Sequence, residues 1–218
     1  ANTYNGATSV DAGVLMLSNN QALGASDGTA ATGTTVAGTY RSLYLNGVTV
    51  TDEALVLSGT GGAADADLTT ANGALRAISG DNVWTGPISL TSGGGDALIK
   101  VDAGATLSLQ GAITLNAANR YLVLGGQGSG NVTGAIGQTA GSTLGLNKID
   151  AGTWTLAGAN SYTGSTLVSG GVLRLANSSA LGGSAASVSG GAALEITGGI
   201  AVANALTLTG TGIADGGA

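Results

Sequence analysis

The chain opens with a segment that returns almost unchanged at an offset of 158 in the numbering. Residues 1–24 read ANTYNGATSVDAGVLMLSNNQALG, and residues 159–182 read ANSYTGSTLVSGGVLRLANSSALG. The likeness continues downstream at a slightly smaller offset, so that Leu57 corresponds to Leu208 at an offset of 151. Repetition on this scale decides the architecture, because each repeat of such a protein packs mainly on its neighbours.

Composition restricts the secondary structure that the repeat can form. Gly accounts for 41 of 218 residues, Phe is absent and hydrophobic residues make up 43%. Gly and Thr destabilise helix interiors, whereas Thr and Val suit a pleated sheet. The apolar fraction is too high for a disordered chain. We therefore predict an all-β protein with a core of Leu, Val, Ile and Ala.

Short apolar-x-apolar stretches between turn formers indicate strands of three to five residues with one inward face. Leu156, Leu175 and Ile196 lie in three such stretches, at steps of 19 and 21 positions. A step of about 20 residues is typical of one coil of a β-solenoid, in which each coil pairs only with the coils above and below it. We predict about eleven coils of roughly 20 residues, stacked at the strand spacing.

The domain organisation follows from the repeats. A third, weaker copy of the opening words begins near residue 81, where Asn, an aromatic residue and Gly recur in the same order. We expect a single β-solenoid segment over 1–218, with an internal repeat at 1–158 and a truncated repeat at 159–218. The weaker copy is a sub-repeat within the first of these.

Two local expectations accompany this organisation. The aromatic residues Tyr4, Trp84 and Tyr162 follow one another at intervals of 80 and 78 positions, which at this coil length equal four coils and place them on one side of the solenoid. The repeat offset falls from 158 at Gly24 to 152 at Val36, so the first copy holds six extra residues. We predict that these make ASDGTAATGTT, residues 25–35, protrude from the rod.

One stretch also resembles a known repeat. Residues 148–164 read KIDAGTWTLAGANSYTG and are followed by Thr166, Val168 and LRL at 173–175. This is similar to the autotransporter-associated β-strand repeat, or passenger-associated transport repeat, whose wording is close to K-x-G-x-G-T-L-T-L-S-G-x-N-T-Y-T-G. Residues 1–17 match the second half of that wording. The resemblance implies a segment of a right-handed parallel β-helix passenger, exported across a bacterial outer membrane to the cell surface or beyond.

No residue pattern predicts a catalytic, cofactor-binding or metal site. His and Cys are absent, which removes His-dependent triads, thiol chemistry and the commonest metal ligands. The glycine-rich stretch 125–130 resembles a phosphate-binding loop, but no Lys and no helix follow it, so we expect a solenoid corner. No cofactor is expected.

Acidic residues offer the remaining candidates for chemistry. A calcium ion would be bound by Asp65 and Asp67 with Asp52 and Glu53, or by Asp96 with Asp102, but the glycine-aspartate nonapeptide of calcium β-rolls is missing. We expect solvated acids. The six cations are scattered singly along the sequence and are Arg41, Arg76, Lys100, Arg120, Lys148 and Arg174. Stacked Tyr4, Trp84 and Tyr162 would bind sugars if exposed, but corner packing is expected.

These observations predict a structural or adhesive bacterial surface or extracellular protein without enzyme activity. The rod would present or space binding elements, or assemble end to end into fibres, with residues 1–10 near residues 206–218 of the next molecule. Its partners would be neighbouring coils of the same or another chain, and host or cell-surface glycans or proteins. A net charge of −6 and a pI of about 4.1 disfavour nucleic acid and anionic membranes, and the apolar runs are too short to insert into a bilayer.

An enzyme remains the alternative. Polysaccharide lyases and hydrolases also use the β-helix, and they act through clustered Asp with Arg or Lys. In this reading the chain is a segment of a β-helical carbohydrate-active enzyme, with an acidic cleft on loops outside the regular coils.

Overall fold

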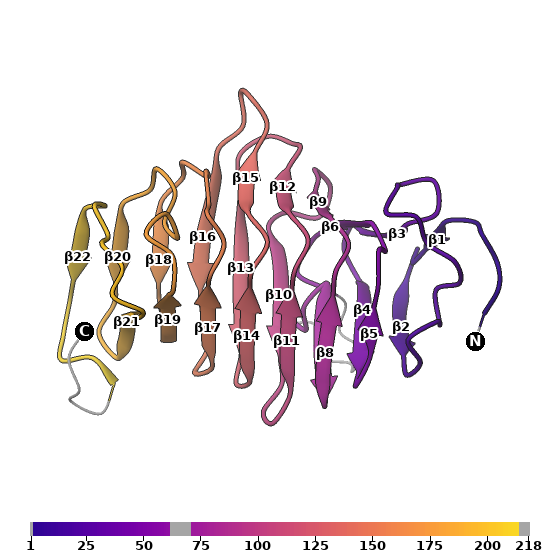
Figure 1. Cartoon of the computed structure of the whole chain (residues 1–218), viewed down its shortest axis with the longest axis horizontal. Helices are drawn as coiled ribbons and strands as arrows, with labels where there is room; N and C mark the ends of the chain where they lie inside the picture. The colour runs from indigo at the N-terminus through magenta and orange to yellow at the C-terminus, as the bar shows by residue number, and fades with distance from the viewer. Residues whose placement is uncertain (1, 62–70, 214–218) are drawn as a thin grey trace.

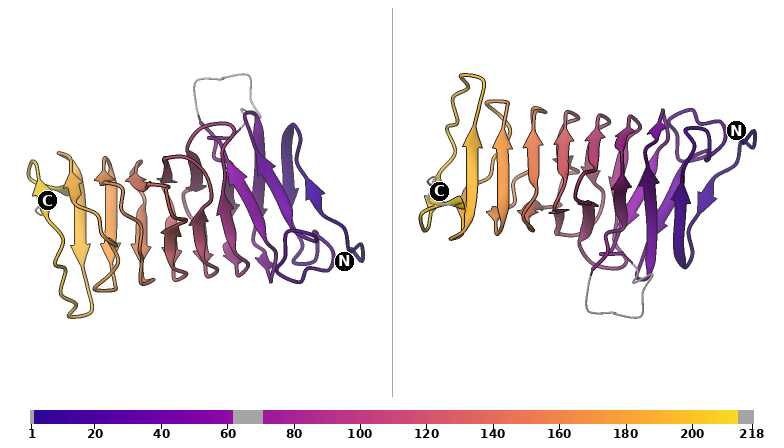
Figure 2. Two further views of the ribbon diagram at one scale, coloured as in Figure 1. Left: turned by 90° about the horizontal axis from the view of Figure 1, so that it is seen from above. Right: turned by 90° about the horizontal axis from the view of Figure 1, so that it is seen from below.

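The computed structural model describes residues 2–61 and 71–213 and shows a parallel β-solenoid (Figure 1). All strand pairings among these residues are parallel, as in a stack of coils. The described part of the chain has no helix that is long and apolar enough to span a bilayer. Successive coils lie side by side from the N-terminus to the C-terminus (Figure 2). The predicted all-β solenoid is confirmed.

Three sheets form the faces of the solenoid. Sheet A consists, in spatial order, of β1 (Thr8–Ser9), β3 (Thr34–Ala37), β6 (Leu55–Ser58), β9 (Ile88–Leu90), β12 (Ile113–Leu115) and β15 (Ile136–Gln138). Sheet B consists of β2 (Gly13–Leu17), β4 (Arg41–Asn46), β7 (Leu75–Ser79), β10 (Ala97–Val101), β13 (Arg120–Gly126), β16 (Leu144–Lys148), β18 (Thr166–Val168), β20 (Ala186–Val188) and β22 (Leu206–Leu208). Sheet C consists of β5 (Thr49–Val50), β8 (Asp81–Trp84), β11 (Thr106–Leu109), β14 (Ser129–Val132), β17 (Thr153–Leu156), β19 (Gly171–Leu175) and β21 (Ala192–Ile196).

The coils are longer and fewer than the sequence predicted. Residues that pair along sheet B lie 28 and 32 positions apart in the first two turns, then 24, 25 and 24 apart. The pairs of the last three turns are 20 positions apart, as at Ala186 and Leu206. The nine strands of sheet B thus enclose eight turns, and the prediction of about eleven coils is wrong.

The change in coil length has a structural cause. Sheet A ends at β15, so the chain afterwards runs from sheet C to sheet B through a corner that contains no strand. Loss of one strand from each coil shortens the step between register partners from 24 positions to 20. Leu156, Leu175 and Ile196 lie in this shorter region, and the step between them does not hold for the rest of the chain.

The predicted line of aromatic residues does not form. Trp84 lies in β8 of sheet C, whereas Tyr162 follows sheet C and precedes β18 of sheet B. Three coils lead from Trp84 through Leu109 and Val132 to Leu156, because register partners here lie 23 to 25 positions apart. Tyr162 therefore occupies a different place in the coil, and the interval between Trp84 and Tyr162 is not four coils.

The prediction that residues 25–35 protrude is wrong for the last two residues. Thr34 and Thr35 belong to β3, and the Thr34 side chain is buried. The preceding residues form a loop organised by Asp27, whose carboxylate accepts hydrogen bonds from the backbone N–H and hydroxyl of Thr29 and from the hydroxyl of Thr32. Hydrogen bonds from Thr29 and Thr32 lower the pKa of Asp27 to about 2.

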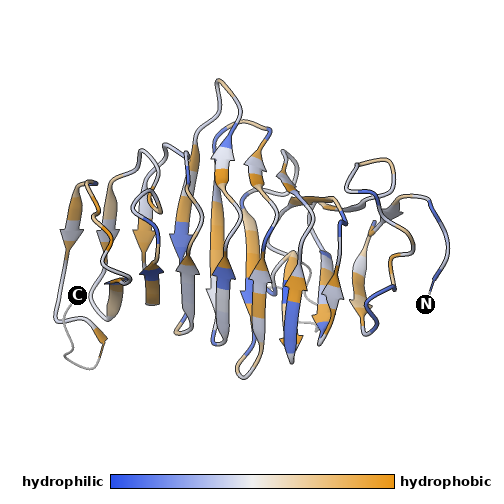
Figure 3. Ribbon diagram, viewed as in Figure 1, coloured by the Kyte–Doolittle hydropathy of each residue, from blue (hydrophilic) through white to orange (hydrophobic). Residues whose placement is uncertain are grey.

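The core consists of aliphatic side chains stacked from coil to coil, as predicted. Leu57, Leu90 and Leu115 are register partners on sheet A, and none is more than 1% exposed. Hydrophobic residues recur along the strands of successive coils (Figure 3). Equivalent residues stack because each coil repeats the path of the one before it.

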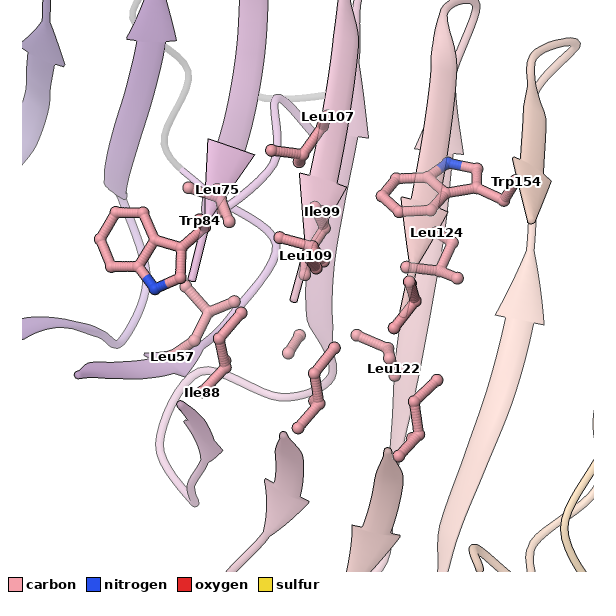
Figure 4. Packing of buried hydrophobic residues seen from close by; sticks show 14 of the residues in the cluster. Leu57, Leu75, Trp84, Ile88, Ile99, Leu107, Leu109, Leu122, Leu124 and Trp154 are labelled. Carbon is pink, nitrogen blue, oxygen red and sulfur yellow. The ribbon is translucent and has the colours of Figure 1, made fainter. Parts of the chain in front are cut away.

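A large aromatic side chain of the core requires glycine in the neighbouring coil. Gly130 is the register partner of Trp154, and a Cβ on Gly130 would lie 2.2 Å from Trp154 Cε3. The indole ring therefore occupies the volume that a side chain at Gly130 would need. Trp154 Nε1 donates to the carbonyl oxygen of Gly125 at 3.0 Å, which fixes the ring. Trp154 and Trp84 lie at separate places in the interior (Figure 4).

We predict that Gly130→Ala destabilises the protein by about 1–3 kcal/mol, because the added methyl group displaces a buried indole in a close-packed core. Gly6→Ala is the matched control, since no atom lies within 4 Å of its Cβ position and its φ is not positive. Denaturant unfolding should show a change below about 0.5 kcal/mol for the control. Equal effects of the two substitutions would contradict the packing described for Trp154.

Candidate functional site

A charged groove lies on the outer face of sheet B. Its walls come from β7, β10 and the corners that follow β13 and β16, and its volume is about 570 Å³. Arg76 and Lys100 are register partners on adjacent strands, so their side chains emerge on the same face. Arg76 Nε lies 2.8 Å from Asp102 Oδ1, and Lys100 Nζ lies 3.5 Å from Asp150 Oδ2. The groove thus contains two ion pairs side by side.

Three of the charged groups in this groove have a further contact. The guanidinium of Arg76 lies over the Tyr44 ring, 5.4 Å from its centroid, as in a cation–π contact. Lys100 Nζ donates to the carbonyl oxygen of Ala71, and Asp150 Oδ2 accepts the N–H of Gly126. Both carboxylates are engaged by cations, so neither is placed as a free general base. The groove is suited to binding a polar ligand through its alternating charges.

The sequence did not reveal this grouping, because the six cations are far apart along the chain. The numbers of Arg76 and Lys100 differ by 24, which is one coil in this region. This spacing was present in the sequence, but it did not match the predicted coil of about 20 residues and so did not indicate that the two residues are neighbours. Arg174 is likewise paired across coils, with its Nε 2.7 Å from Glu195 Oε2.

The glycine-rich stretch 125–130 is a solenoid corner, as expected. It spans the end of β13 and the start of β14. Gly126 has a φ of 97°, which favours glycine, and its N–H is bound by Asp150 rather than being free for a phosphate.

The acidic residues considered as calcium ligands, and expected instead to be solvated, form no cluster in the described part of the chain. Asp96 and Asp102 lie at opposite ends of β10, and Asp96 Oδ1 accepts the N–H of Tyr121. Asp65 and Asp67 lie outside the described residues. Within 2–61 and 71–213, no group of three or more acidic residues is close enough to hold a metal ion.

Residues that the two repeat copies share form hydrogen bonds with one another. The Tyr162 hydroxyl bonds Thr166 Oγ1 at 2.8 Å, and Thr166 Oγ1 bonds Ser184 Oγ at 2.8 Å. Burial raises the pKa of Tyr162 to about 12, although the bond to Thr166 opposes the shift. The first copy repeats one of these bonds, because Tyr4 contacts Thr8 at 2.8 Å. Tyr162 packs in a corner as expected, whereas Tyr4 is 41% exposed.

Asn160 ends sheet A. Its Oδ1 accepts the N–H of Ile136 in β15, and its Nδ2 donates to the carbonyl oxygen of Ala180 in the next coil. The Asn160 amide and one backbone bond, from the N–H of Ser161 to the carbonyl oxygen of Ile136 at 2.9 Å, thus take the place of a further strand of sheet A.

Lys148 is buried at the corner between β16 and β17. Its Nζ donates to the carbonyl oxygens of Ile149, Asp150 and Gly170 at 2.6–2.8 Å, so all three of its protons are used. Burial lowers the pKa of Lys148 to about 8, and the charge of Asp150 opposes the shift. Asp150 has a φ of 59° at the position where the repeat wording has glycine.

Comparisons with known proteins give two matches. The family model described as "Passenger-associated-transport-repeat" matches residues 1–17 and 146–175. The chain is 35% identical over 107 residues to the "Adhesin BmaC autotransporter" of Brucella suis biovar 1 (strain 1330). That alignment covers 47% of this chain and 3% of the relative, so the chain spans a small part of that protein. No solved structure matches.

The resemblance to the passenger-associated transport repeat is therefore confirmed. The match at 146–175 includes Lys148, Trp154, Asn160 and Tyr162, whose contacts are structural. The repeat and the adhesin relative fit a surface adhesive passenger at the bacterial cell surface or outside the cell.

We predict that Lys148→Met destabilises the protein by about 2 kcal/mol, because three partly buried carbonyl oxygens lose their charged donor. Lys100→Met is the matched control, since its ion pair is partly exposed and should contribute less than about 1 kcal/mol. Urea unfolding at pH 7 measures both. A smaller loss for Lys148→Met than for the control would contradict the role given to this lysine.

The buried carboxyl group of Glu53 should make the stability of the protein depend on pH. Glu53 is 1% exposed, so the expectation of a solvated acid is wrong at this position. Thr34 donates to its Oε1 at 2.6 Å, and its Oε2 has no hydrogen-bond partner. Burial raises the pKa of Glu53 above its ordinary value of 4.5, and the bond from Thr34 opposes the shift. The folded state therefore holds this proton more tightly than the unfolded state. The stabilisation of the folded state by this bound proton is fully present below pH 4.5 and is lost as the pH rises through the pKa of Glu53 in the folded state.

Glu53→Gln should accordingly be more stable than the unmodified chain at pH 7 and should lose this part of the pH dependence. Asp11→Asn removes a carboxylate whose side chain is 84% exposed and should leave the dependence unchanged. Thermal unfolding between pH 4 and pH 8 provides the measurement. A parallel pH profile for Glu53→Gln and the unmodified chain would refute the prediction.

Proposed function

From the passenger-associated transport repeats that this chain carries, we propose that it is a segment of an exported bacterial surface adhesin. Its β-solenoid acts as a rod that presents and spaces binding elements outside the cell, without catalysis. The observation that carries this proposal is the coincidence of the repeat with the coils of the solenoid. The likeness to an autotransporter adhesin supports the same function and location.

The structure is suited to a spacing role. Each coil bonds its neighbours through parallel backbone ladders, so the length of the rod grows with the number of coils. The chain has no Cys, and hence the rod is held without disulfides. Side chains on the outer faces contribute little to the core and are free to vary for binding. The partners that fit such surfaces are host or cell-surface glycans or proteins.

A further coil is proposed to cover the last described one. Leu206 and Leu208 of β22 are 38% and 50% exposed, whereas their register partners Ala186 and Val188 are buried. Unpaired strand edges with apolar side chains recruit another strand. We propose that the covering coil belongs to another molecule, so that the rods assemble end to end into fibres.

The carbohydrate-active enzyme is the second candidate, and one observation favours it. The charged groove gathers Asp102 and Asp150 with Arg76 and Lys100, the residue types that a polysaccharide lyase uses. Each carboxylate is held by a cation at 2.8 Å or 3.5 Å, which supports binding rather than proton transfer.

An adhesion assay tests the proposal. Beads coated with the folded chain should bind mammalian epithelial monolayers several-fold better than beads coated with the heat-unfolded chain, because binding elements are displayed only on the stacked coils. Acidic plant and bacterial polysaccharides incubated with the chain should release no sugar ends above a heat-treated control. Equal binding by both bead preparations would contradict adhesion, and sugar release would contradict the absence of catalysis.

A further inference from the structure

A second groove lies at the other end of the sheet B strands, where the chain enters β13 and β16. Its volume is about 530 Å³, and it is separate from the ion pairs of the charged groove. Its walls include Asp96, Arg120, Tyr121 and Ser165. Asp96, Arg120 and Tyr121 precede the matched stretch 146–175, so the repeat wording does not account for them.

Tyr121 lies flat on the outside of the sheet. Its register partner is Gly145, and a Cβ on Gly145 would lie 2.4 Å from Tyr121 Cε1 and 2.6 Å from Cδ1. The ring therefore covers the Gly145 backbone. The hydroxyl reaches one coil further and bonds Ser165 Oγ at 2.9 Å. The ring packs against the glycine, its tip is bound to Ser165, and the half-buried side chain lines the groove.

Polar groups surround this aromatic ring. Asp96 Oδ1 accepts the backbone N–H of Tyr121 at 2.8 Å, which holds the carboxylate beside the ring. Arg120 Nη1 donates to the carbonyl oxygen of Asn119, while Arg120 Nε is buried and has no hydrogen-bond partner. Among the described residues the guanidinium makes this one hydrogen bond, so further N–H groups of this groove-lining cation remain for a ligand. One cation and one carboxylate leave this groove without net charge.

We propose that this groove binds a neutral pyranose residue of a glycan. The C–H groups of a sugar ring pack on the ring of Tyr121, and its hydroxyl groups bond Arg120 and Asp96. A fixed apolar surface with a few placed polar groups is what a small-molecule site requires, and an aromatic ring supplies it at little cost in conformational entropy. Charge balance in the groove favours a neutral sugar over a uronate. The inference rests on the proposed adhesive function and names a ligand class for it.

A purely structural role for Tyr121 is the competing explanation. An aromatic ring that covers a strand glycine also stabilises the sheet without any ligand. The two roles differ in what a sugar does to the protein. Saturation-transfer NMR with maltotriose, cellotriose and triacetylchitotriose as probes, on the folded chain, distinguishes them.

At least one of the three trisaccharides should receive saturation from the unmodified chain. Tyr121→Ala should weaken its affinity at least tenfold, and Tyr121→Phe, which keeps the ring, should stay within about threefold. Arg120→Gln leaves the ring and its glycine contact in place and should weaken the affinity about fivefold. Tyr40→Ala removes another exposed tyrosine, 58% exposed, and should have no effect.

Absence of transfer to all three sugars would overturn the proposal, as would unchanged binding by both Tyr121→Ala and Arg120→Gln. The unfolding midpoint of Tyr121→Ala shows whether that variant folds. If it does not fold, the result with Arg120→Gln alone decides. Bead adhesion without any sugar signal would end the proposal for this groove and leave the adhesive function standing. Sugar binding without any bead adhesion would contradict the adhesive function and leave the proposal for this groove standing.

Discussion

The vertical register between coils governs the rest of this structure. Each residue lies on an equivalent residue of the coil below, joined to it by the parallel ladder, so a side chain must fit both its own coil and its neighbours. The consequences are visible at Trp154 over Gly130 and at Tyr121 over Gly145, where one coil holds a large ring and the other holds no side chain. Glycine is needed at these two positions for volume rather than for conformation.

Corners follow a different rule from faces. At the corner between β16 and β17 the carbonyl oxygens of Ile149 and Asp150 accept hydrogen bonds from a side chain, that of Lys148, which also donates to Gly170 of the next coil. At the end of sheet A the N–H of Ile136 likewise bonds a side chain, through the oxygen of Asn160. The repeat thus carries polar residues at the points where strand pairing stops.

The sequence predicted the fold better than the number of its coils. Alternating apolar residues, abundant Gly and the two strong copies were sufficient for an all-β solenoid with an aliphatic core. The predicted coil length was wrong because the apolar steps that indicate it lie after β15, where sheet A has ended, and earlier coils have a third strand. That error also misplaced Trp84 relative to Tyr162 and concealed the pairing of Arg76 with Lys100. The glycine corner at 125–130 was predicted correctly, because its glycines without a following Lys are a local feature that does not depend on coil length.

Cross-linking across the coils tests the register most directly, and the chain contains no Cys that would interfere. Ser89→Cys with Thr114→Cys joins register partners of the longer coils, and Ser187→Cys with Thr207→Cys joins register partners of the shorter ones. Both pairs should form a disulfide under mild oxidation, because facing residues on adjacent strands lie within disulfide reach. Ser92→Cys with Ala112→Cys, which applies the spacing of the shorter coils to the region of longer ones, should not. Cross-linking of this last pair in place of Ser89 with Thr114 would contradict the change in coil length between the two parts of the solenoid.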